Sequence, residues 1–327
     1  MKMKGRKKMA VPGNVMHNRG LHLLAILVAA MTLLLLVAGA LVTSNEAGDS
    51  VPDWPLSFGR WLIQSSHFVA NVRYEYSHRV IAALVGLTTA ILAIRTWTSE
   101  RRPLIRKLAL TAFAGVLTQA LLGGIRVWFP ASKPVIAVIH ALVAQSFFGL
   151  IVALVLLTSA DWLKPKPLKE DAGFPSTRRL AVVTLCAVLT QLVLGAGFRH
   201  GAFGIVPHIV GALVVSSLVI WTALIILHRY GGDACLRRPV LVMLVLLSCQ
   251  VGLGILAYVA RLKSKFDVQP LEPMISLTVA HVVVGALTLA SIVVLTLRCW
   301  RTLTPSRETT RQAQSSFNPV GKIIAHL

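Results

Sequence analysis

Long apolar runs dominate the chain and alternate with shorter polar segments. A helix needs about 20 apolar residues to cross the hydrocarbon core of a bilayer. Eight runs are long enough, so the pattern predicts an all-α, polytopic membrane protein with eight transmembrane helices. Their expected bounds are 21–43, 79–98, 107–127, 135–159, 180–198, 205–227, 239–260 and 275–298.

The spans divide into two pseudo-repeated four-helix bundles. Three odd-numbered spans share the string Q-x-x-L-G, which begins at Gln119, Gln191 and Gln250, and each even-numbered span opens with a histidine. This indicates one helical hairpin used four times. The glycines would allow close helix packing in lipid or admit a flat macrocycle. The expected organisation is a basic tail (1–20), an N-terminal half (21–159), a linker (160–178), a C-terminal half (179–300) and a C-terminal tail (301–327).

Composition excludes a disordered chain and an ordinary soluble enzyme. Hydrophobic residues make up 55% of the chain and charged residues only 14%, against about 25% charged in a soluble domain. The formal net charge of +21 does not predict a nucleic-acid partner, because the basic residues lie at the ends of apolar runs. Most of them share one side of the bilayer if the N-terminus is cytoplasmic. We therefore expect a plasma (inner) membrane protein with both termini in the cytoplasm.

Four histidines lie at the outer ends of the even-numbered spans: His78, His140, His208 and His281. Ionisable residues in a membrane are costly, and four at similar depth on one side indicate function. His78 and His208 are expected to begin their helices, with the other two about one turn deeper. Zinc and copper need more ligands than two histidines provide, whereas haem iron needs only one or two axial side chains. We expect two haem sites, His78/His140 and His208/His281; the alternative is histidines hydrogen-bonded between helices.

One carboxylate distinguishes the two pairs. Glu75 precedes His78 by three residues, and residues at this spacing share a helix face. The equivalent positions before the other three histidines hold no carboxylate. The N-terminal pair is therefore expected to be a reaction site and the C-terminal pair a permanent electron-transfer cofactor site. The alternative is a surface ion pair between Glu75 and Arg79.

Three arginines at outer helix ends, Arg79, Arg126 and Arg199, could bind haem propionates. Interfacial arginines whose side chains extend to water are an equally good interpretation.

The segment 44–77 contains the string P-D-W-P at 52–55, which predicts a rigid turn. We expect either a lid over the first site or a loop in the bilayer interface. Its aromatic residues expected at the bilayer surface are Trp54, Phe58, Trp61 and Phe68.

The strings E-Y-S-H-R (75–79) and P-D-W-P, with a histidine opening alternate spans, together resemble the haem A synthase family of cytochrome oxidase assembly proteins. The resemblance implies an oxidoreductase acting on a CH group, which oxidises the C8 methyl of haem O to a formyl group. Its partners would be haem O synthase and cytochrome oxidase assembly factors. Some members carry two cysteines in the first outer loop, and this chain has none there. The implied site is haem b on His208 and His281, substrate haem on His78 and His140, and Glu75 as the catalytic acid/base.

Two other classes of function fit the pattern less well. A dihaem b-type, quinol-oxidising electron-transfer subunit predicts equivalent sites, usually at different depths, whereas these histidines share one side. A transporter built from repeats would place its site near the midplane between broken helices.

Overall fold

The computed structural model describes residues 17–129, 133–264 and 270–305. Within these residues lie eight helices that are long and apolar enough to cross a membrane, as the hydropathy predicts. Residues 1–16 and 306–327, which make up most of the two expected tails, lie outside the described residues. The long helices are α1 (Arg19–Ser44), α2 (Val72–Ser99), α3 (Pro103–Trp128), α4 (Lys133–Thr158), α6 (Thr177–Arg199), α7 (Val206–Tyr230), α8 (Ala234–Lys263) and α9 (Met274–Thr302).

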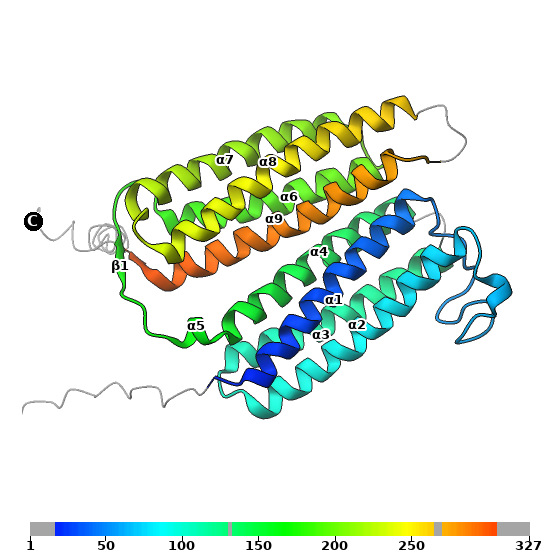
Figure 1. Cartoon of the computed structure of the whole chain (residues 1–327), viewed down its shortest axis with the longest axis horizontal. Coiled ribbons are helices and arrows are strands. Elements are labelled where there is room, and N and C mark those ends of the chain that lie inside the picture. The colour runs from blue at the N-terminus through cyan, green and yellow to red at the C-terminus, as the bar shows by residue number, and fades with distance from the viewer. Residues whose placement is uncertain (1–16, 130–132, 265–269, 306–327) are drawn as a thin grey trace, which may run out of the picture.

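These helices form two four-helix bundles that lie side by side (Figure 1). In each bundle every helix contacts the next one, and the last helix returns to the first: α1 to α4 form one ring and α6 to α9 the other. The N-terminal bundle closes tightly, since Nδ1 of His22 in α1 lies 3.1 Å from Oγ1 of Thr158 at the end of α4. Helix α9 runs along α1 and α4, and Phe148 packs against Ala286 and Ala290 between the bundles.

A proline inside α8 is accommodated by the neighbouring helix. Pro239 has no N–H and cannot donate to the carbonyl of Cys235, four residues earlier. Arg298 of α9 donates to that carbonyl at 2.9 Å. The main-chain group that the proline leaves unpaired is therefore satisfied from outside the helix.

The linker between the halves is structured. It carries α5 (Ala160–Leu163) and β1 (Lys169–Asp171), and β1 pairs in parallel with β2 (Leu303–Pro305), directly after α9. The buried carboxylate of Asp171 accepts hydrogen bonds from Oγ of Ser176 and from the N–H groups of Thr177 and Arg178. Burial alone would raise the pKa of Asp171, but these bonds outweigh it and hold that pKa below its ordinary value. The sequence did not predict this strand pairing.

The two ends of the bundles carry different structures. At one end, called the histidine end below, α1, α3, α6 and α8 finish and the next helices begin. The loop 45–71 projects from this end (Figure 1) and contains a short 3₁₀ helix, η1 (Ser65–His67). The linker with β1 lies at the opposite end.

Candidate functional site

His208 of α7 and His281 of α9 lie next to each other in the C-terminal bundle. Their ring centroids are 6.2 Å apart, and the ring planes cross at 84°. Two imidazoles on opposite sides of one metal have centroids about 6 Å apart, because a metal–nitrogen bond is about 2 Å and the nitrogen lies about 1 Å from the ring centre. The observed spacing fits one iron held between these two rings.

A glycine on the preceding helix makes room for three of the four rings. A Cβ built on any of these three glycines would lie between 2.8 and 3.1 Å from Cε1 of the imidazole, closer than most Cβ atoms approach. A larger residue would therefore displace the ring. Gly123, which precedes His140, has nothing within 4 Å of its Cβ position among the described residues. The three pairs are Gly39/His78, Gly195/His208 and Gly254/His281.

The rings of the N-terminal pair have fewer close hydrogen-bond partners than those of the C-terminal pair. His140 of α4 lies within electrostatic range of His78 in α2, and both lie within range of Arg126. Nδ1 of each ring is buried and has no hydrogen-bond partner among the described residues. In the C-terminal pair both Nδ1 atoms have partners: Nε2 of Gln191 lies 3.0 Å from that of His208, and the main-chain oxygen of Gln250 lies 3.1 Å from that of His281.

The expected depth of His78 is wrong. Helix α2 begins at Val72 rather than near residue 79, so His78 lies in its second turn. His78 is therefore about as far into α2 as His140 is into α4, and no difference of one turn separates them along their helices. Among the residues before His78 in α2, Glu75 has hydrogen-bond partners in the loop 45–71.

Glu75 is buried, with 6% of its surface exposed. Its Oε2 accepts hydrogen bonds from Oγ of Ser50 and the N–H of Val51, both at 3.0 Å. Its Oε1 forms a salt bridge with Nη2 of Arg79 at 2.6 Å. The i, i+4 ion pair is therefore present, but it lies beneath the loop and not on the surface.

Arg79 fastens the same loop through main-chain oxygens. Its Nη1 donates to the carbonyls of Asp53 and Leu56 at 2.6 and 3.0 Å, and its Nη2 donates to that of Val51 at 3.2 Å. Four acceptors thus surround this guanidinium group. Glu75 and Arg79 together hold the segment 50–56 against α2.

Trp54 of the P-D-W-P string packs on α3, not on the bilayer surface as expected. A Cβ on Gly124 would lie 2.8 Å from its ring, and its ring meets Trp128 edge to face at 5.1 Å. Phe58 is also engaged, stacked on His67 at 4.6 Å. Trp61 is 76% exposed, which agrees with a position at the interface.

Of the three candidate propionate partners, Arg126 and Arg199 keep buried nitrogen atoms unpaired. Nε of Arg126 and Nη1 of Arg199 have no hydrogen-bond partner among the described residues. The guanidinium of Arg126 lies against Gly48 of the loop, where any Cβ would overlap it. Nη2 of Arg199 reaches from α6 to α1, donating to the carbonyl of Ala40 and Oγ of Ser44 at 2.9 Å.

His200, to which the sequence assigned no role, also lies at the histidine end. Burial and the nearby Arg199 and Arg126 lower the pKa of His200 to about 4, so its ring is neutral at pH 7. His140 is another of its electrostatic neighbours. Its position immediately after Arg199, where α6 ends, is the sequence feature that could have placed His200 near the candidate site.

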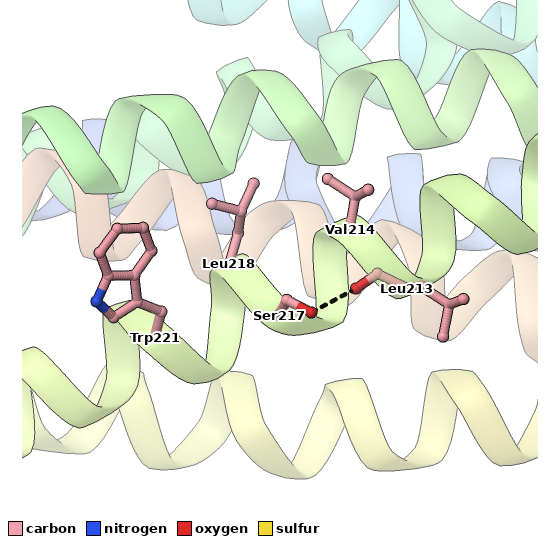
Figure 2. Close-up of a pocket in the computed structure, with 5 residues that line it drawn as sticks. All are labelled: Leu213, Val214, Ser217, Leu218 and Trp221. Carbon is pink, nitrogen blue, oxygen red and sulfur yellow. Dashed lines mark hydrogen bonds between the residues drawn. The ribbon is translucent and has the colours of Figure 1, made fainter.

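Other places in the described structure offer less chemistry. No three His, Cys, Asp or Glu side chains among the described residues gather into a metal-binding group. A hollow of ≈ 430 Å³ lies along α7. Figure 2 shows the side chains that line it, with Oγ of Ser217 donating to the main-chain oxygen of Leu213. Its lining residues, none of them a carboxylate, histidine or cysteine, are Leu213, Val214, Ser217, Leu218 and Trp221.

The fold and these contacts define a multi-pass, mainly helical membrane protein with four histidines near one end, two of them with ring centroids 6.2 Å apart and one beside a fastened loop. Residues 22–207 match the family described as cytochrome oxidase assembly protein (COX15-CtaA). This chain belongs to that family. The matched segment includes Glu75, His78 and His140 and ends immediately before His208.

Similar curated proteins carry the name "Heme A synthase". The protein of Shouchella clausii is 29% identical over 187 residues, 56% of this chain and 60% of that protein. The protein of Alkalihalophilus pseudofirmus is 35% identical over 147 residues, 44% of this chain and 46% of that protein. The protein of Geobacillus thermodenitrificans is 26% identical over 228 residues, covering 68% and 61%. This chain thus spans about half to three-fifths of the length of these relatives.

Proposed function

We propose that this protein is a haem A synthase, an oxidoreductase that oxidises the C8 methyl group of haem O to a formyl group and makes haem A for terminal cytochrome oxidase. Its family and the names of its relatives support this proposal. The observation that carries it is the difference between the two histidine pairs. A permanent cofactor needs fixed ligands, whereas a substrate must enter and leave. Both C-terminal rings have close hydrogen-bond partners at Nδ1, whereas Nδ1 of His140 has none among the described residues.

In this proposal the C-terminal half, 179–300, holds haem b through His208 and His281. Their 6.2 Å spacing and the two glycines that accommodate the rings fit an iron with two axial imidazoles. Bound haem b would supply one-electron transfer. The protein holds the two rings in place from α7 and α9.

The N-terminal half, 21–159, would bind the substrate haem between His78 and His140. Glu75 would act as the acid/base, because oxidation of a methyl group releases protons and a carboxylate can accept them. Arg126 and Arg199 would bind propionates through their unpaired nitrogens. Arg79, which the loop already engages, would contribute mainly by holding the segment 50–56 and excluding water.

We further propose a plasma (inner) membrane location, with both termini and the linker 160–178 in the cytoplasm and the histidine end facing outward. The concentration of Lys and Arg at the linker end supports this orientation. Haem O synthase and cytochrome oxidase assembly factors are the proposed partners, with haem O as the substrate.

The alternative of a dihaem electron-transfer subunit predicts two equivalent sites. The described structure favours the synthase because the sites differ in ring partners and because Glu75 lies three residues from His78.

Expression of the full chain beside a haem O source, followed by chromatography of the extracted haems, tests the proposal. We expect haem A from the wild type, and its absence would overturn the assignment. His208→Ala and His281→Ala should each lose a low-spin, bis-histidine haem spectrum. Glu75→Ala should keep that spectrum and form no haem A; haem A at the wild-type level would remove Glu75 from its proposed role.

A further inference from the structure

An exposed turn joins β1 to α6 at the linker end of the molecule, opposite the histidines (Figure 1). Phe174 in this turn is 94% exposed, more than any other large apolar side chain among the described residues. Arg229, in the last turn of α7, donates from Nη1 and Nη2 to the main-chain oxygens of Pro175 and Phe174 at 3.1 and 3.2 Å. The main chain of the turn is thus fixed to α7, while the phenyl ring of Phe174 lies almost entirely outside the protein.

The length of α6 places this turn at the surface of the bilayer. Helix α6 has 23 residues. It is therefore about 34 Å long, slightly more than the hydrocarbon core of about 30 Å. Its first residue, Thr177, then lies at the edge of the core, and Phe174, three residues earlier, lies in the headgroup layer. Aromatic side chains are favoured at this depth. Trp300, which is 52% exposed near the end of α9, lies beside the start of α6 and fits the same depth.

Basic side chains surround the turn. The guanidinium of Arg178 stacks over the ring of Trp300 at 3.9 Å, and its Nε is buried and has no hydrogen-bond partner among the described residues. Arg179 is exposed in the same first turn of α6. The segment 171–179 contains one carboxylate, Asp171, which is buried and already accepts from N–H groups at the start of α6. With Arg229, three guanidinium groups therefore leave the outside of the turn positively charged.

We propose that the turn 172–179 binds an anionic phospholipid. Phe174 lies between the headgroups and the acyl chains, and the phosphate groups face Arg178, Arg179 and Arg229. Each basic residue beside a membrane helix raises the affinity for anionic lipid about fivefold. A soluble anionic partner would satisfy the arginines alone, whereas the depth of Phe174 places this ring among lipids. The site lies at the opposite end from the histidines and does not depend on the proposed function.

Native mass spectrometry of the purified full chain tests this proposal by titration with phosphatidylglycerol or phosphatidylcholine in the same detergent. We expect the wild type to bind phosphatidylglycerol more tightly. Arg179→Gln should weaken phosphatidylglycerol binding about fivefold and leave phosphatidylcholine unchanged. Phe174→Ser should weaken both lipids about tenfold, because it removes the apolar contact that they share. Both side chains are exposed, so neither change disturbs the core.

Arg238→Gln is the matched control, because it removes an exposed charge near the start of α8, at the same end of the molecule but outside the turn. It should bind both lipids as the wild type does. A loss as large as that of Arg179→Gln would overturn the proposal, since total charge and not this turn would then attract the lipid. Equal affinity of the wild type for the two lipids would also overturn it. Glycerol 3-phosphate, which has the anionic group without acyl chains, should not compete; competition would indicate a phosphate site in which Phe174 has no part.

Discussion

Replacing Glu75 with glutamine should release the loop between α1 and α2. The carboxylate accepts hydrogen bonds from Ser50, Val51 and Arg79 inside a buried site. Glutamine keeps the shape of the side chain, but its NH₂ group must face either the guanidinium of Arg79 or the N–H of Val51. Both are donors, so one of them loses its acceptor.

The size of the effect follows from the burial of this ion pair. Removing one partner of a buried pair costs about 3–5 kcal/mol, and each 1.4 kcal/mol is a factor of ten. The open population of the segment 50–56 should therefore rise by on the order of a hundredfold or more. Amide hydrogen exchange follows this population directly when opening and closing are fast.

Hydrogen–deuterium exchange of Val51 is the measurement, because its N–H donates to Glu75 itself. We expect its exchange to accelerate in Glu75→Gln, while Phe58 and Gly59, whose amides donate to Asp53 within the loop, keep their protection. Glu46→Gln alters an exposed carboxylate of the same loop and should match the wild type. Wild-type exchange at Val51 in Glu75→Gln would refute the role given to this carboxylate.

Three further changes test other contacts. Asp171→Asn should lower the free energy of unfolding by about 1–3 kcal/mol at pH 7. The pKa of Asp171 in the folded protein lies below its ordinary value, so the wild type loses this advantage as its carboxylate is protonated. Thermal melts in detergent should therefore show the difference in stability between variant and wild type shrinking as the pH falls below about 4. Gly195→Ala should reduce the haem content of the purified protein, whereas Gly123→Ala, with open space at its Cβ, should not; equal losses would contradict the glycine argument. Arg298→Met should cost about 1–3 kcal/mol by leaving the partly buried carbonyl of Cys235 unpaired. Pro239→Ala should reduce that cost by restoring a helical N–H, so an undiminished cost in the double variant would disprove the pairing.

Hydropathy predicts the spans well because a bilayer requires a minimum apolar length, but it misplaces the start of α2. Residues 73–78 are polar and resemble a loop in sequence. They are helical because Glu75 and Arg79 find partners in the loop 45–71, and hydropathy contains no information about such partners.

The sequence predicts which residue types make up the candidate site, but it predicts few of the contacts between them. The spacing of the histidines and the uniqueness of Glu75 are visible in the sequence, and so is the repeated Q-x-x-L-G. A string within one span does not reveal which atom of the next helix its glutamine meets: Gln119 donates to the main-chain oxygen of His140, whereas Gln191 also contacts the ring of His208. The pairing of β1 with β2 was equally hidden, since two three-residue strands far apart in the chain have no hydrophobic period.

In each four-helix bundle the first and last helices are neighbours, and this has a consequence for how such a protein can arise. In the N-terminal half the first and last helices touch at His22 and Thr158, and in the C-terminal half β1 and β2 bring Lys169 beside Leu303. A unit whose two ends are neighbours can be joined head to tail to another without rearranging either one. The short connector 159–168 is then all that is needed to turn two separate bundles into a single gene product.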